Sequence, residues 1–105
     1  MYDVIKTETV QEQIDNIVDY MISEFANVNI AIEFLSDIDD AACMISRYPQ
    51  IGKEYEPEEK LEKTYRIKRV KNCKLFYTID EDKKEIYIAY IFHDLQDVLI
   101  EAQVD

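Results

Sequence analysis

Apolar positions in the N-terminal half of the chain repeat with the period of an α-helix. After a short β-prone stretch at residues 2–6, apolar residues recur every three or four positions over residues 10–25 and again over residues 31–45. Pro49 cannot continue a helix and Gly52 permits a turn, so the second helix should end just before them. This half of the chain therefore predicts one strand followed by two amphipathic helices.

The ends of the two predicted helices carry recognisable capping residues. Thr9 and Glu12 fit a capping box at the start of the first helix, and Asn27 or Asn29 can cap the second. Only residues 26–29 separate the two apolar stripes. A joint this short predicts an antiparallel helical hairpin.

The C-terminal half changes to the two-residue period of β-strands. Residues 53–63 are charged and aperiodic, which predicts a surface loop. Residues 65–68 and 73–79 alternate between apolar and polar side chains, whereas residues 85–92 are apolar on both faces and fit a central, covered strand. Residues 94–103 return to helical spacing and predict a short closing helix.

These elements predict an α+β fold in the order β-α-α-β-β-β with a short C-terminal helix. The antiparallel helical hairpin would pack on one face of a small, mainly antiparallel, four-stranded sheet and bury both apolar stripes. The first and last strands could be neighbours, but the pattern leaves this open. With 105 residues, the chain should form one domain over residues 1–105.

Charge and cysteine content narrow the class of protein. The formal net charge of −11 argues against broad, non-specific binding of nucleic acid. Cys43 and Cys73 form no CxxC pattern or disulfide framework. Residues 1–7 do not resemble a secretory signal, and no apolar run is long enough to span a membrane. We therefore expect a cytoplasmic protein that does not contact membranes.

The positive charge is concentrated on one predicted β-hairpin. Residues 60–79 hold seven basic residues and one acidic residue, whereas residues 1–59 hold three basic and fourteen acidic residues. This hairpin could form a local anion site. Alternatively, its cations could pair with the acidic helices on a solvated face.

Candidate catalytic chemistry is sparse. No glycine-rich phosphate loop, nucleophile elbow or metal-ligand spacing is present, so we expect no cofactor and no metal. His93 stands at the end of the last strand, where its imidazole could act as a general acid or base, or simply bond to the backbone.

Several short sequence motifs, in their order and spacing, resemble those of the RelE/ParE superfamily of type II toxins. These motifs run from Tyr2-Asp3-Val4 at the start to Ile91-Phe92-His93 near the end. Between them come Ile14-Asp15-Asn16-Ile17-Val18-Asp19-Tyr20, Ala31-Ile32-Glu33-Phe34-Leu35, Tyr48-Pro49-Gln50-Ile51-Gly52, Tyr65-Arg66-Ile67 and Lys74-Leu75-Phe76-Tyr77-Thr78-Ile79-Asp80.

The resemblance implies a toxin that a cognate antitoxin neutralises. The long helical hairpin and the P-x-x-G exit are closest to the ParE-like branch, also described as plasmid stabilisation proteins. Members of that branch inhibit growth by binding DNA gyrase and are not known to use catalytic residues of their own. Asp94 and Asp97 stand where this branch often has basic residues after the histidine.

Two alternatives remain open at this level. In a RelE-like toxin, which cleaves mRNA on the ribosome, the catalytic residues would be Arg66, Lys68, Lys74 and His93. The arginine and tyrosine that this branch usually carries near its C-terminus are absent here. The other alternative is a non-toxic protein-interaction module that keeps the fold.

The antitoxin, or the target, needs a surface on which to bind. Leu95, Val98 and Leu99 could supply an apolar patch for this contact, and Lys71 on the basic hairpin is a further candidate contact. Antitoxin tails bind such toxins as an added strand or as a helix in a groove. An acidic toxin would favour an antitoxin less acidic than usual.

Overall fold

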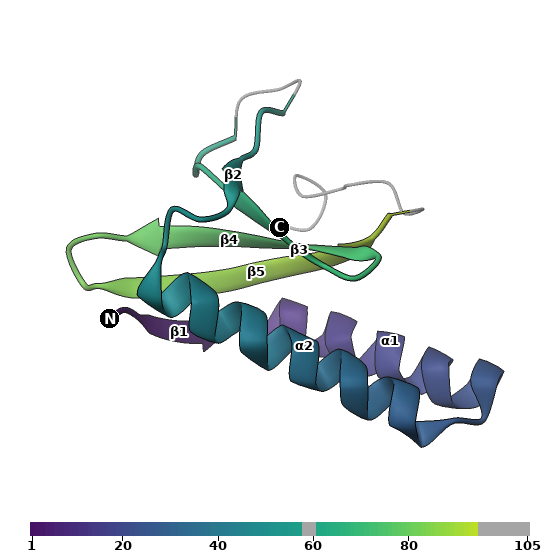
Figure 1. Ribbon diagram of the computed structural model, residues 1–105. Helices are drawn as coiled ribbons and strands as arrows, with labels where there is room; N and C mark the ends of the chain where they lie inside the picture. The colour runs from purple at the N-terminus through teal and green to yellow at the C-terminus, as the bar shows by residue number, and fades with distance from the viewer. Residues whose placement is uncertain (58–60, 95–105) are drawn as a thin grey trace.

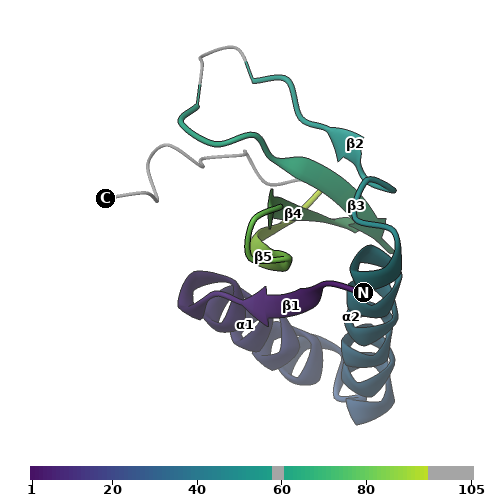
Figure 2. The same cartoon turned by 90° about the vertical axis from the view of Figure 1, so that its left-hand side faces the viewer.

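A strand and two long helices make up the first half of the fold. The computed structural model describes residues 1–57 and 61–94. Strand β1 (Asp3–Lys6) leads into helix α1 (Glu8–Phe25), and helix α2 (Val28–Arg47) follows after a joint of two residues. The helices run antiparallel along one side of the sheet, as Figure 1 and Figure 2 show. The predicted helical hairpin is therefore confirmed.

Helix α1 begins earlier than the sequence predicts. The Thr7 side chain accepts a 3.1 Å hydrogen bond from the backbone N–H of Val10, so Thr7 is the N-cap and the capping box at Thr9 and Glu12 is wrong. The sheet decides this position, because the backbone N–H of Thr7 still donates to the Ile88 carbonyl at 3.1 Å. The chain leaves the sheet at Thr7, and the first helical turn forms at once.

The hairpin joint and the end of α2 follow their sequence signals. Ala26 adopts a left-handed conformation with φ of 49°, and Asn27 accepts a hydrogen bond from the Asn29 N–H at 3.0 Å. Of the two predicted caps, Asn27 is therefore the one used. Helix α2 ends at Arg47, two residues before Pro49, as predicted.

The sheet is mixed and has five strands in the described residues. After β2 (Lys53–Glu54) come β3 (Arg66–Val70), β4 (Cys73–Asp80) and β5 (Glu85–His93), and the order across the sheet is β1-β5-β4-β3-β2. Strand β1 pairs in parallel with β5, and the other pairs are antiparallel. The first strand, β1, and the last strand, β5, are therefore neighbours, a point that the sequence pattern left open.

Strand β2 corrects the prediction of a loop over residues 53–63 and of a four-stranded sheet. Lys53 pairs with Ile67, and Glu54 pairs with Arg66. Two residues are too few for an alternation to be detected, so this strand leaves no periodic signal in the sequence. It forms because the preceding segment is held against β3 and β4, as described below.

The main hydrophobic core lies between the helical hairpin and the sheet. Its residues come from both helices and from strands β3, β4 and β5, and nine of them are at most 2% exposed. These nine are Val10, Ile14, Ile38, Ile45, Leu75, Tyr77, Ile86, Ile88 and Ile91. Each apolar stripe found in the sequence therefore faces the sheet along most of its length, as predicted, but Ile22, Phe25 and Leu35 near the closed end of the hairpin are 39%, 58% and 40% exposed.

A second, aromatic cluster covers the opposite face of the sheet. Phe76, at 0% exposure, meets Phe92 edge to face with ring centroids 5.6 Å apart, and Tyr65 and Tyr90 complete the buried set. Tyr55, from the connection between β2 and β3, packs on Phe76 at 5.2 Å. Figure 2 shows this connection rising over the face of the sheet turned away from the helices. Both faces of β4 and β5 are therefore covered, as the apolar run at residues 85–92 predicts.

The predicted C-terminal helix at residues 94–103 falls almost entirely outside the described residues. Strand β5 ends at His93, and Asp94 is the last residue that the structure describes.

Candidate functional site

The basic hairpin formed by β3 and β4 divides its charges between the two faces of the sheet. Arg66 and Lys68 lie opposite residues of β4 that belong to the main core, so they share the helix-facing side. Arg69 and Lys74 lie opposite each other on the other side. The hairpin is therefore not a single basic face.

The four residues predicted for RNA cleavage do not converge. Arg66 lies opposite Tyr77, whereas His93 lies opposite Cys73, four residues further along β4 and roughly 13 Å away at the usual strand rise. Lys74 stands on the other face. Only Arg66 and Lys68, two residues apart on one strand, are brought together by the fold.

Lys71, at the turn between β3 and β4, binds the second helix. Its ammonium lies 2.8 Å from a carboxylate oxygen of Glu33 and 3.5 Å from one of Asp37. The hydrogen bond from Lys71 lowers the pKa of Glu33, and the same hydrogen bond raises the pKa of Lys71. This contact matches the alternative in which the hairpin cations pair with the acidic helices.

Arg69 forms an ion pair at the end of the last strand. Its Nη1 atom lies 2.9 Å from both carboxylate oxygens of Asp94. Asp94 thus neutralises one basic residue of the hairpin.

Asp94 also lies near the buried thiol of Cys73. Burial raises the pKa of that thiol, and the Asp94 carboxylate raises it further.

The Arg66 side chain binds the backbone of the segment that follows α2. Its Nη1 atom donates to the carbonyl oxygen of Gly52 at 2.6 Å and, more weakly, to that of Gln50 at 3.4 Å. The hydroxyl of Tyr77 donates to the Pro49 carbonyl at 2.6 Å and accepts from the Gly52 N–H at 2.9 Å. Arg66 therefore has a structural role that its position in the sequence does not reveal.

A groove of about 300 Å³ runs between α2 and β3. Acidic side chains of Asp37 and Asp40 line one wall, Lys68 and Lys71 line the other, and Met44 is 42% exposed beside them. The opposite charges across this groove attract each other, so the groove offers no concentrated field of either sign.

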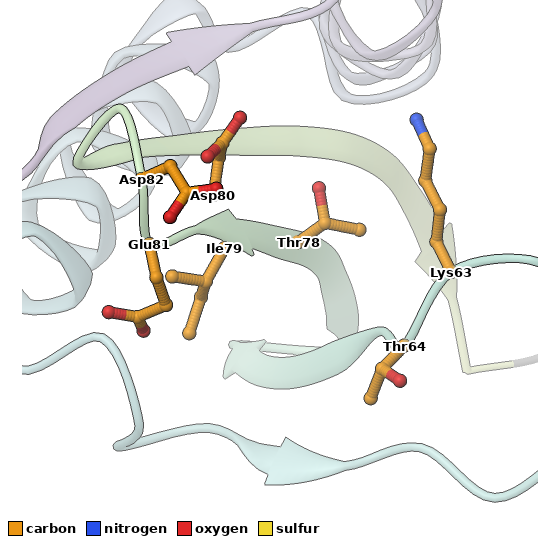
Figure 3. Close-up of a pocket in the computed structure, with 7 residues that line it drawn as sticks. All are labelled: Lys63, Thr64, Thr78, Ile79, Asp80, Glu81 and Asp82. Carbon is orange, nitrogen blue, oxygen red and sulfur yellow. The ribbon is translucent and has the colours of Figure 1, made fainter.

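A second hollow, of about 460 Å³, lies beside the turn between β4 and β5 (Figure 3). Asp80 ends β4, Glu81 and Asp82 lie in the turn, and Lys63 and Thr64 approach from the segment before β3. Across residues 1–57 and 61–94, no group of three or more His, Cys, Asp or Glu side chains is placed to hold a metal ion.

Several residues of the site were not anticipated from the sequence. Glu33, Asp37 and Asp94 each neutralise a cation of the hairpin, but they are 38, 34 and 25 residues away from their partners. Acidic residues are so abundant in this chain that none of the three stands out. Leu95, Val98 and Leu99, the predicted apolar contacts for a partner, lie outside the described residues.

Neither helix in the described residues has an apolar stretch long enough to cross a bilayer.

Comparison with known proteins identifies a family model and a solved structure that are similar to this chain. The family model "ParE toxin of type II toxin-antitoxin system, parDE" matches residues 4–98. A solved structure, "Chromosomal ParDE TA system from P. aeruginosa", superposes with a TM-score of 0.70 at 17% identity and covers 89% of this chain and 96% of that chain. No curated protein sequence matches the chain.

The α+β fold and the family match together define a small toxin of a type II toxin-antitoxin system. Within that class, the chain belongs to the ParE toxin family. The resemblance found in the sequence is confirmed.

Proposed function

We propose that this ParE-family toxin arrests growth by binding DNA gyrase and that it has no RNA-cleaving activity. The observation that carries this proposal is the dispersal of the hairpin cations. Cleavage of RNA requires a base near the 2′-hydroxyl and positive charge near the phosphate at the same time. Arg66 and His93 are roughly 13 Å apart along the sheet, and Lys74 stands on the opposite face.

Most of the basic residues considered for the site already have partners within the protein, and this supports binding of a target protein over catalysis as the mode of action. Arg69 is paired with Asp94, Lys71 with Glu33, and Arg66 with the backbone of the segment after α2. A phosphate would have to compete with these carboxylates and carbonyls for each cation, which favours binding to a protein target over RNA cleavage.

We further propose that a ParD-type antitoxin neutralises this chain and binds at the open edge of β3. Strand β2 covers only Arg66 and Ile67, so within the described residues Lys68, Arg69 and Val70 have no neighbouring strand on that side. A lysine on an exposed edge strand discourages unwanted pairing, and here the Lys68 ammonium also donates to the Arg69 carbonyl at 3.4 Å. An antitoxin strand could replace that contact and lie next to Lys71. The cytoplasmic location and the single domain over residues 1–105 stay predictions.

Expression of the chain without an antitoxin tests the gyrase proposal. Growth should stop, plasmids recovered from the arrested cells should lose negative supercoils, and the purified protein should inhibit supercoiling by gyrase in vitro. Arrest with unchanged plasmid topology and an uninhibited gyrase would overturn the proposal.

The RelE-like alternative is tested in the same cells by mapping transcript ends. We expect no new cleavage sites in mRNA. If cleavage occurs and is abolished by alanine at Arg66, Lys68, Lys74 and His93 together, the chain is a nuclease. Normal growth together with a stable antitoxin complex would instead support the non-toxic interaction module.

A further inference from the structure

The closed end of the helical hairpin carries large apolar side chains that the fold does not bury. Figure 1 shows this end of α1 and α2 reaching beyond the strands. Ile22 and Phe25 on α1 are 39% and 58% exposed, and Val28, Ile32 and Leu35 on α2 are 56%, 57% and 40% exposed. Single exposed apolar residues are common, but a group gathered at one end of two helices is typical of a binding surface.

Three of these residues form a stripe of their own on α2. Val28, Ile32 and Leu35 are spaced at i, i+4 and i+7, so they lie on one side of the helix. Ile32 lies about 160° around the helix from Phe34, which is 3% exposed and faces the main core. The stripe of Val28, Ile32 and Leu35, here called the outer stripe, is therefore distinct from the buried stripe of α2.

The surroundings of the outer stripe are strongly acidic. Residues 8–47, which span both helices, contain nine acidic residues and one basic residue, Arg47, for a net charge of −8. Only three of the nine carboxylates have an ion-pair partner among the residues that the structure describes, namely Glu33, Asp37 and Asp39. On α2 only Asp40 lacks such a partner among the described residues, and the other five unpaired carboxylates lie on α1. The hairpin that carries the outer stripe therefore keeps a net negative potential, most of it from α1.

We propose that the outer stripe binds a basic amphipathic helix of a partner protein. The apolar face of the partner's helix would cover Val28, Ile32 and Leu35. The lysines or arginines of that helix would lie near the carboxylates of the hairpin. A second copy of this chain is the less favourable occupant, because it would bring two hairpins of charge −8 together. The inference goes beyond the proposed action on gyrase and does not depend on it.

Two synthetic helical peptides of about 18 residues, or five turns, provide the probe. One has a leucine face and lysines elsewhere, and the other has the same leucine face with glutamates. The lysine peptide should bind the purified chain in a fluorescence anisotropy titration, and the glutamate peptide should not. Binding of the lysine peptide should weaken as salt is added.

A triple variant, Val28→Gln, Ile32→Gln and Leu35→Gln, separates the apolar contribution from simple charge attraction. It keeps the net charge and does not lower the helix propensity. Because it removes the apolar contacts, a ten-fold or larger loss of affinity for the lysine peptide is expected. The control variant, Tyr48→Gln with Ile51→Gln, removes two side chains that are 61% and 47% exposed outside the hairpin. It should bind the peptide as the wild type does.

Three results would overturn the proposal. The first is unchanged binding of the lysine peptide by the triple variant, which would reduce the effect to non-specific attraction. The second is equal binding of the glutamate peptide. The third is a wild-type dimer in sedimentation equilibrium that the triple variant converts to monomer, because a second copy would then be the occupant.

Folding of the triple variant is checked by circular dichroism, and the single change Ile32→Gln, with a smaller loss of affinity expected, serves if the triple variant unfolds. These titrations use only the purified chain and a peptide. Their outcome is therefore independent of whether gyrase is the target.

Discussion

The hydroxyl of Tyr77 lies within hydrogen-bond distance of the backbone N–H of Gly52, 2.9 Å away, although the two residues are 25 positions apart. The same hydroxyl donates to the Pro49 carbonyl at 2.6 Å. Tyr77 stands on β4 with no exposed surface, so a core side chain holds the backbone that leaves α2. This relationship sets the position of β2, which follows Gly52 directly.

We predict that Tyr77→Phe destabilises the protein by about 1–3 kcal/mol, because it leaves the Gly52 N–H and the Pro49 carbonyl without their partner. Urea unfolding followed by circular dichroism measures this. Tyr87→Phe is the matched control, since within residues 1–57 and 61–94 its hydroxyl donates to Glu85 alone, at 2.7 Å, on a partly exposed part of β5. Equal losses in the two variants would contradict the proposed role of Tyr77.

Gly52→Ala should also be destabilising, by roughly 1–3 kcal/mol, for a steric reason. A Cβ atom at position 52 would lie 2.6 Å from the Tyr77 hydroxyl oxygen and 2.7 Å from the Ile67 carbonyl oxygen. The second of these is backbone and cannot rotate away. If Tyr77→Phe rescued Gly52→Ala completely in a double variant, the Ile67 carbonyl would not be the obstacle that the geometry indicates.

The start of α1 can be tested with a pair of threonines. Thr7→Ala removes the N-cap and the 3.2 Å hydrogen bond from Thr7 to the Ala89 carbonyl, so a loss of about 1 kcal/mol or more is expected. Thr9→Ala changes an exposed residue inside the first turn and should have little effect. Thermal or urea unfolding distinguishes the two, and a larger effect at Thr9 would restore the capping box that the sequence suggested.

The ion pair between Lys71 and Glu33 predicts a pH-dependent contribution to stability. The pKa of Glu33 is lowered in the folded protein by the hydrogen bond from Lys71, so the contact stabilises above the ordinary carboxyl pKa. It is lost as the pH falls through the lowered value. Lys71→Met should therefore be less stable than wild type at neutral pH, and the difference should shrink in acid.

Lys83→Met is the control for that comparison. Lys83 lies on the exposed turn between β4 and β5, and its ammonium has no carboxylate within ion-pair distance in the part of the chain that the structure describes. Its substitution should leave the pH dependence unchanged. Since both partners of the Lys71–Glu33 contact are exposed, added salt should also reduce the Lys71→Met difference. A difference that persists in acid and in salt would mean that Lys71 acts through something other than Glu33.

Long periodic segments of the sequence were sufficient to predict the helices and the three main strands. The apolar stripes of α1 and α2 extend over several turns, and seven consecutive apolar residues, 86–92, lie within the nine-residue strand β5, so each segment buries enough surface to impose its structure. Strand β2 was missed because its two residues are positioned by Tyr77 and Arg66, not by their own pattern.

The candidate site was predicted less well because its contacts are made between distant parts of the chain. The alternation over residues 65–68 is enough to place Arg66 and Lys68 on one side of their strand, but only the pairing with β4 shows that Lys74 lies on the other face. Likewise, the choice of Thr7 over Thr9 as N-cap depends on where β1 leaves β5.

Local chemistry in the sequence determined the class of fold and the unequal distribution of charge, because periodicity, capping and composition act over a few neighbouring residues. The parallel pairing of β1 with β5, the division of the basic hairpin between two faces, and its neutralisation by Glu33, Asp37 and Asp94 were decided only by the tertiary structure. These features depend on which strand lies beside which, and that choice is made by burying the whole core at once.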